Sequence, residues 1–131
     1  MKKAVIILLL VFSATLFAQS EIKITSKKCI SKKGYHLRLK RVFDDSRCPE
    51  NVSCIWAGEV SIEMEVYKDK KIIEEKTLLL NINNSEENIK WLTNYLPKKS
   101  NSIKSITVLP YPKEGQIIKS KNQFVKINYH D

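Results

Sequence analysis

The residues best suited to covalent chemistry are two cysteines within one short segment, residues 45–58 of the 131-residue chain. Pro49 and Asn51 lie between Cys48 and Cys54 and favour a turn there. Three cysteines allow three pairings, and we predict the Cys48–Cys54 disulfide because both residues lie in the same irregular stretch. Closing so small a loop stabilises a domain by about 2–2.5 kcal/mol on the chain-entropy estimate.

The third cysteine, Cys29, stands alone after two lysines. We expect it to be a partly buried spare thiol. An intermolecular disulfide is the alternative for an unpaired cysteine in an exported protein.

Carboxylates around the predicted disulfide raise the question of a metal site. Calcium takes several oxygen ligands, and Asp44, Asp45, Glu50 and Glu59 supply four carboxylates. Their spacing matches no known calcium loop, which favours hydrogen bonds within turns instead. A zinc site needs several sulfur or nitrogen ligands, and a chain with two histidines and a disulfide is poorly supplied with them. We therefore predict no metal and no cofactor.

Nucleophilic catalysis needs a nucleophile with a base beside it and a third group that orients the base. Ser46 and Ser53 lie in the cysteine segment, and His36 is the one plausible base. Nothing in the sequence brings His36 to either serine, so the sequence favours a protein that is not an enzyme.

The other residues of the segment indicate a fixed loop. Arg47 needs a partner if the loop packs down, and Asp45 and Glu59 are the nearest carboxylates. We expect Trp56 to enter the core, whereas an exposed Trp56 would be a contact residue. The predicted structural motif comprises Asp45, Arg47, Pro49, Trp56 and Gly58.

The N-terminus has the layout of a secretory signal peptide. Lys2 and Lys3 precede an unbroken apolar run, residues 4–11, and small residues lead to Ala18. We predict cleavage after Ala18 and a single exported domain, residues 19–131, in the periplasm or outside the cell. The run is too short to span a bilayer comfortably.

The chain is basic, with 23 Lys and Arg against 14 Asp and Glu and a net charge of +9. Removing Lys2 and Lys3 leaves +7 on the mature domain. Such a surface attracts anionic lipids, polysaccharides or acidic proteins. We expect an envelope protein or an anionic surface as partner, and no nucleic acid, because no nucleic-acid-binding motif is present. The candidate binding residues are Arg38, Lys40, Arg41 and Glu50.

Alternating apolar and polar residues predict strands along most of the domain. Lys68-Asp69-Lys70 is a polar break between two such runs and predicts a hairpin turn. The predicted strands are residues 21–26, 35–40, 59–66, 71–80, 103–109 and 124–129.

One segment departs from this period, because Ile89, Leu92 and Leu96 lie three and four residues apart. A short helix near 86–96 fits, with Ser85 as its cap and Pro97 as its stop. An irregular connection is the alternative.

Several short strands with at most one short helix predict an all-β fold, an antiparallel two-layer β-sandwich. A small β-barrel is the alternative.

The run from Asp45 to Gly58 resembles the Asp-Ser-Arg-Cys-Pro and Cys-x-Trp-Ala-Gly signature of a family of small exported bacterial proteins. The ending Leu109-Pro110-Tyr111-Pro112 before a last strand is similar too. The resemblance implies secretion and a β-rich fold, and it implies no activity.

Two classes of function remain. The first is an exported, non-catalytic binding or structural module with the disulfide-closed loop as its contact surface, because rigid scaffolds commonly present recognition loops. A variant of it is a protease inhibitor that presents this loop. The second is a hydrolase whose site is assembled only in three dimensions.

Overall fold

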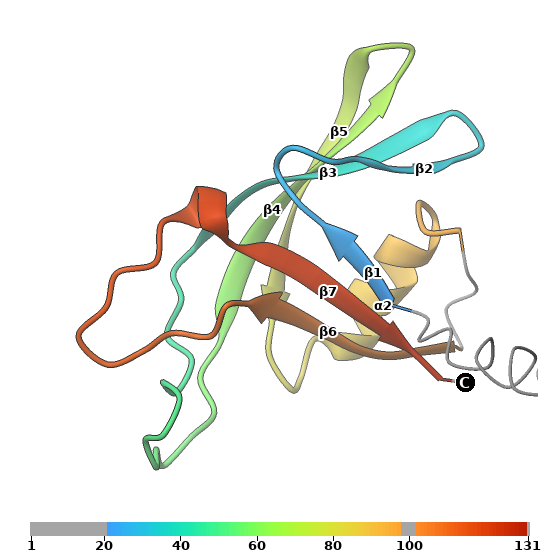
Figure 1. The fold of residues 1–131 in the computed structure, drawn as a ribbon. Coiled ribbons are helices and arrows are strands. Elements are labelled where there is room, and N and C mark those ends of the chain that lie inside the picture. Colours follow the sequence, from blue (N-terminus) through green and yellow to red (C-terminus); the bar gives the residue numbers. More distant parts are fainter. Residues whose placement is uncertain (1–20, 98–101, 131) are drawn as a thin grey trace, which may run out of the picture.

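The structure, a computed structural model, describes residues 21–97 and 102–130 as two antiparallel sheets and one α-helix (Figure 1). One sheet has the strand order β1-β7-β6 and the other β2-β3-β4-β5. This confirms the predicted sandwich, and the two sheets remain separate rather than closing into a barrel. The strands are β1 (Glu21–Ile24), β2 (Ile30–Lys32), β3 (Tyr35–Phe43), β4 (Val60–Lys68), β5 (Lys71–Leu80), β6 (Ile103–Leu109) and β7 (Phe124–Tyr129).

Strand β4 shows why alternating residues form this sheet. Its Ile62, Met64 and Val66 are fully buried on the face that meets the other sheet. The opposite face carries Glu63 and Glu65, and β4 is central, so neighbouring strands cover these carboxylates as well. Burial on both faces makes β4 the structural centre of the four-stranded sheet.

The turn between β4 and β5 confirms the predicted hairpin. Asp69 and Lys70 have φ values of 50° and 65°, which suit a two-residue turn that follows the sheet twist. The pairing runs from Lys68 opposite Lys71 to Val60 opposite Leu80, with one irregularity near Val66.

Strand β2 was not predicted. It has only three residues, too few for an alternating pattern to be visible, and it pairs with the start of β3. Lys33 and Gly34 make the turn between the two strands, with φ values of 49° and 84°.

The core fills the space between the sheets and beneath the helix. Leu92 of the helix and Leu96 just beyond it are fully buried, so this segment closes one end of the sandwich. The fully buried strand residues include Ile24, Val108, Val125 and Ile127 from one sheet and Leu37, Ile62, Met64 and Val66 from the other.

The predicted helix is present as α2 (Ser85–Thr93) and is shorter than the 86–96 pattern. Asn84, not Ser85, occupies its N-cap position, so the predicted Ser85 cap is wrong. The Asn81 side chain instead accepts the backbone N–H groups of Asn83 and Asn84 at 3.0 and 2.9 Å, which fixes the turn before the helix.

The predicted signal peptide, residues 1–18, lies outside the described residues. Across residues 21–97 and 102–130, no helix has the length and apolar character needed to cross a bilayer.

Candidate functional site

The cysteine segment extends the β3–β4 hairpin beyond the end of the sandwich. The last strand pair is Phe43 opposite Ser61. Past it, the Ser46 N–H donates to the Glu59 carbonyl at 2.8 Å and the Cys48 N–H donates to the Ala57 carbonyl at 3.1 Å. Residues 45–58, hereafter the disulfide loop, therefore project from the body as a two-stranded ribbon (Figure 1).

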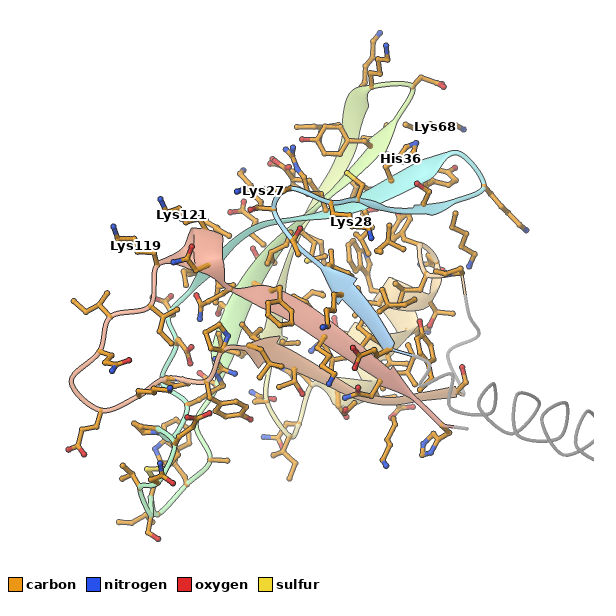
Figure 2. All side chains as sticks on the ribbon, in the orientation of Figure 1. Lys27, Lys28, His36, Lys68, Lys119 and Lys121 are labelled. Carbon is orange, nitrogen blue, oxygen red and sulfur yellow. A yellow bond between two sulfur atoms is a disulfide. The ribbon has the colours of Figure 1, made fainter. Side chains whose placement is uncertain are left out.

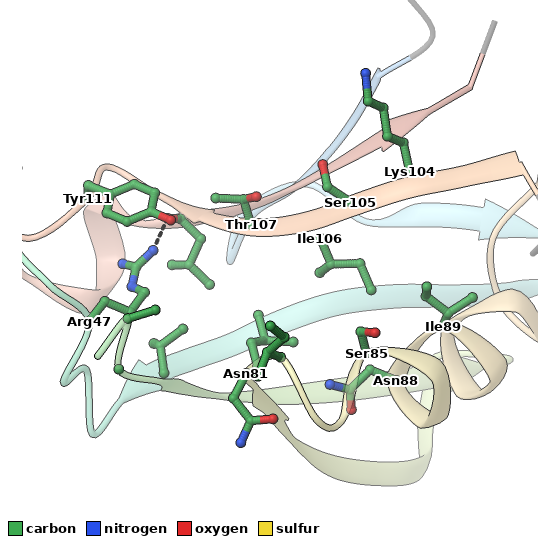
Figure 3. Close-up of a pocket in the computed structure, with 16 residues that line it drawn as sticks. Arg47, Asn81, Ser85, Asn88, Ile89, Lys104, Ser105, Ile106, Thr107 and Tyr111 are labelled. Carbon is green, nitrogen blue, oxygen red and sulfur yellow. Dashed lines mark hydrogen bonds between the residues drawn. The ribbon is translucent and has the colours of Figure 1, made fainter. Parts of the chain in front are cut away.

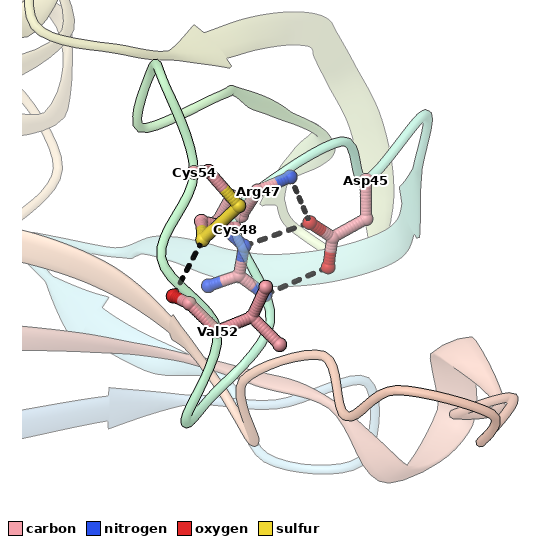
Figure 4. The surroundings of a disulfide bond; sticks show 5 residues. All are labelled: Asp45, Arg47, Cys48, Val52 and Cys54. Atoms are coloured by element: carbon pink, nitrogen blue, oxygen red, sulfur yellow. Dashed lines mark hydrogen bonds and ion pairs between the residues drawn. A yellow bond between two sulfur atoms is a disulfide. The ribbon is translucent and has the colours of Figure 1, made fainter.

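The Cys48–Cys54 disulfide closes the tip of this ribbon and confirms the predicted pairing (Figure 4). Its Cα atoms lie 5.9 Å apart, within the usual range. The Glu50 N–H donates to the Pro112 carbonyl at 3.0 Å, which joins the tip to the loop before β7. The tip is thus held both by a covalent bond and by a neighbouring segment.

Arg47 anchors the base of the disulfide loop, as predicted (Figure 4). Its side chain is only 7% exposed, and Nε and Nη2 donate to the two carboxylate oxygens of Asp45 at 2.8 and 2.7 Å. Nη1 donates to the Val108 carbonyl of β6 at 2.5 Å, and the guanidinium lies 4.4 Å from the centre of the Tyr111 ring. One side chain therefore joins three segments, and the pairing partner is Asp45 rather than Glu59.

The Asp45 carboxylate stays ionised in this setting. Burial works against its charge, but the hydrogen bonds and the positive charge of Arg47 outweigh burial and hold the pKa of Asp45 below its usual value. The pair is a fixed ionic link, with both oxygens of the carboxylate engaged.

Gly58 allows the two sides of the ribbon to approach closely. Its φ is +74°, and a Cβ atom there would lie 2.1 Å from the Ser46 carbonyl oxygen and 2.8 Å from the Arg47 Cα. Only glycine fits this position without moving the backbone.

Trp56 does not enter the core, so that prediction is wrong. It is 64% exposed, and its neighbours Ile55 and Val52 are 108% and 39% exposed. The physical reason is that the ribbon runs past the last strand pair, Phe43 opposite Ser61, and beyond the end of the sandwich (Figure 1). Pro49, next to Cys48 in the same tip, is partly buried and restricts the chain there.

The predicted binding cations lie on the outer face of the four-stranded sheet, where carboxylates neutralise them. Arg38 donates to Glu65 at 2.6 Å, and Lys40 lies 2.9 Å from Glu75. Arg41 lies 2.5 Å from Glu63. Arg38, Lys40 and Arg41 are therefore each paired with a carboxylate of a neighbouring strand. Glu50 lies apart from them, exposed at the tip of the disulfide loop.

Other lysines supply the exposed positive charge (Figure 2). Lys27 and Lys28 follow β1. Lys119 directly precedes the short 3-10 helix η2 (Ser120–Asn122), and Lys121 lies within it. Both segments contact β3, since the Leu39 N–H donates to Thr25 and the Val42 N–H donates to Ser120. These four lysines are in no ion pair with the residues that the structure describes.

A groove runs along β6 (Figure 3). Its other wall is formed by the end of β5 and by α2. The groove encloses about 270 Å³. Arg47 and Tyr111 form one end, and Ala57 and Gly58 of the disulfide loop are among its lining residues. This groove, hereafter the edge groove, was not visible in the sequence because it joins segments far apart in the chain.

The serine and histidine considered for catalysis are not brought together. His36 lies at the start of β3 and Ser46 lies beyond its end. Because each strand residue adds about 3.3 Å, the two residues are roughly 25–30 Å apart. His36 instead bonds through Nδ1 to the Ser31 hydroxyl at 2.8 Å. Among residues 21–97 and 102–130, no three His, Cys, Asp or Glu side chains gather in a way that could hold a metal ion.

Compared with protein-family models, with curated proteins and with solved structures, the chain shows no match.

Proposed function

We propose that this protein is an exported binding module that presents the tip of the disulfide loop to a protein partner in the cell envelope. The observation that carries the proposal is the exposure of Trp56 and Ile55 on a loop of fixed conformation. Tryptophan is among the residues that contribute most to binding at protein interfaces. Because the disulfide, Arg47 and the ribbon hydrogen bonds already order the loop, little conformational entropy is lost on binding.

Export is part of the proposal and rests on two observations. The N-terminal sequence has the layout of a signal peptide, and the Cys48–Cys54 bond suits an oxidising compartment. The resemblance of residues 45–58 to a signature of small exported bacterial proteins agrees with this location.

The exposed lysines suit a partner with negative charge. Lys27, Lys28, Lys119 and Lys121 contribute to the net positive charge of the mature domain, and none of them forms an ion pair with another residue that the structure describes. Such charge raises the rate of encounter with an acidic partner and loses its effect as salt rises. A protease is one class of partner that a rigid closed loop fits.

The test is to capture partners from envelope extracts with the mature protein and with a Trp56→Ser variant. The matched control is Ile117→Ser, because Ile117 is also almost fully exposed, at 98%, but lies in a different loop. We expect Trp56→Ser to weaken the captured interaction by at least about 30-fold, as for a typical hot-spot residue. Both variants should melt at the temperature of the parent. Equal binding by the two variants would contradict the proposal.

A further inference from the structure

We propose that the exposed edge of β6 binds an extended segment of a partner polypeptide as an added antiparallel strand. The inference deepens the proposed function and rests on it, because it states how the partner is held beside the disulfide loop.

The pairing of β6 with β7 fixes the direction in which the β6 backbone groups point. The His130 N–H donates to the Ser102 carbonyl at 2.6 Å, so the next pair, Ile103 and Tyr129, is not hydrogen-bonded. One extra residue, Lys104, then forms a bulge in β6. Hydrogen-bonded and non-hydrogen-bonded pairs alternate beyond the bulge. The pairs Ile106–Ile127 and Val108–Val125 are therefore non-hydrogen-bonded pairs.

The N–H and C=O groups of Ile106 and Val108 therefore point away from β7, toward the edge groove. An independent contact agrees with this direction, since the Val108 carbonyl accepts the Arg47 guanidinium from outside the sheet. Within the part of the chain that the structure describes, Arg47 is the group bonded to this edge, and it occupies only the Val108 end. No described residue bonds to the outward N–H and C=O groups of Ile106, so both are open to a ligand.

Two of the other edge strands are short, and the third, β5, is covered where it meets the groove. Strand β1 has four residues and β2 has three, which leaves little length for pairing. At the end of β5 beside the groove, the buried Asn88 side chain of α2 donates to the Leu79 carbonyl at 2.8 Å. Strand β6 has seven residues and no comparable cover along its middle among the described residues.

The edge groove provides room for the side chains of an added strand (Figure 3). Ile106 points into it from β6, and Leu80 and Ile89 line the facing wall. An added strand lies about 4.8 Å from its neighbour, and its alternate side chains would enter this apolar space. The inward positions of the ligand should therefore be apolar.

Charge specifies the outward positions. The described residues that line the groove include two cations, Arg47 and Lys104, and no Asp or Glu. Arg47 is neutralised by Asp45, whereas Lys104 is exposed and makes no ion pair with any described residue. Because directly opposed charges on neighbouring strands attract, an acidic side chain beside Lys104 is favoured. The expected ligand alternates apolar and acidic residues in extended conformation.

The groove and the loop tip form a continuous surface along the chain. Ala57 and Gly58 line the groove, and Trp56 directly precedes them. A partner that contacts Trp56 can therefore place a strand along β6 without a long connection.

The test uses a synthetic library of acetylated, amidated hexapeptides and the mature protein. We expect selected peptides to alternate apolar residues with Asp or Glu. N-methylation of the peptide amide that faces β6 should weaken binding at least tenfold, and N-methylation of the next amide should change it little. Hydrogen exchange of the Ile106 and Val108 amides should slow on binding, because these are the donors that the added strand takes.

Ile106→Pro removes the Ile106 backbone N–H, which does not bond to β7. Proline is tolerated on an edge strand where the N–H faces solvent. It should weaken peptide binding at least tenfold. The N-methylated peptides probe the same bonds on the unmutated protein, so the result does not depend on how this variant folds. The proposal is overturned if the library yields no peptide with a Kd below about 1 mM. It is also overturned if both N-methylated forms bind equally well, or if a second copy of this chain is what protects the Ile106 amide.

Capture of the envelope partner separates the two proposals. If Trp56→Ser abolishes capture and Ile106→Pro leaves it intact, the strand-addition proposal fails and the loop proposal stands. If Ile106→Pro abolishes capture and Trp56→Ser leaves it intact, the loop proposal fails and strand addition stands.

Discussion

Arg47 is the residue on which the disulfide loop depends most. Its guanidinium is largely buried, yet all three of its nitrogens donate hydrogen bonds. Two of them donate to Asp45 and the third donates to the Val108 carbonyl of β6. Such a side chain links the loop to the sandwich rather than serving as a contact for a ligand.

Arg47→Ala should therefore destabilise the domain. Removing one partner of a buried ion pair lowers the free energy of unfolding by about 3–5 kcal/mol. We expect a value near the lower limit, because the Asp45 side chain is 20% exposed. Urea unfolding measures it, with Lys40→Ala as the control, since an exposed ion pair contributes under about 1 kcal/mol. An Arg47→Ala protein as stable as the parent that loses its partner would place Arg47 in the binding surface instead.

Gly58 has a steric role that a matched pair of variants can isolate. Gly58 and Gly115 have nearly equal φ values, +74° and +72°, but a Cβ atom at Gly115 would meet nothing within 4 Å. Gly115→Ala thus reports the backbone strain alone, about 1–2 kcal/mol. We expect Gly58→Ala to lower the free energy of unfolding clearly further in chemical denaturation. Similar losses for the two variants would show that the ribbon relaxes at no cost.

At the scale of the elements, the disulfide loop is a ribbon attached to a core that does not include it. Replacing Cys48 and Cys54 with serine should lower stability by about 2–2.5 kcal/mol, the chain-entropy value for so short a loop, and leave the sheets folded. Thermal unfolding followed by far-UV circular dichroism measures this, with Cys29→Ser as the control expected to change little. Loss of all sheet signal in the double variant would show that the loop is needed for folding.

The elements also show what the sequence alone could predict. Alternation identified β1, β3, β4, β6 and β7, and the apolar residues after the polar break at residues 68–70 indicated β5. The spacing of Ile89 and Leu92 indicated α2. Strand β2 was missed because three residues carry no period.

The sequence indicated the disulfide and the Arg47 pairing because the partners are close in the chain. It misplaced Trp56 because apolar character does not distinguish a core residue from a contact residue. The edge groove could not be predicted, because it depends on how β6 and α2 are placed in three dimensions.

At the scale of the whole molecule, ionised carboxylates on several elements contribute to stability. Burial opposes the charge of Glu65, but hydrogen bonds from Arg38 and Tyr67 outweigh it and lower its pKa. Hydrogen bonds from Tyr95 and Trp91 lower the pKa of Glu74. Glu65 links β3 to β4, and Glu74 links α2 to β5. Asp45 joins two residues within the disulfide loop through its pair with Arg47.

These shifts predict the sign of the pH dependence. A carboxyl group whose pKa is lower in the folded state stabilises the fold above its unfolded pKa, near 4, and loses that contribution as pH falls through the folded pKa. The free energy of unfolding should be nearly flat from about pH 7 to pH 5 and should fall below about pH 4. Denaturant titrations at several pH values measure it, and Asp45→Asn should reduce the slope. Constant stability down to pH 3 would contradict these ionic links.

The proposed binding function depends on Trp56 being a solvent-exposed contact on a fixed loop. The most direct measurement is fluorine NMR of the protein labelled with 5-fluorotryptophan, which gives one resonance each for Trp56 and Trp91. We predict that a soluble paramagnetic agent broadens the Trp56 resonance much more than that of Trp91, and that the captured partner protects Trp56. A Trp56 resonance that the agent leaves sharp in the free protein, or that the bound partner leaves as accessible as before, would contradict the proposed function.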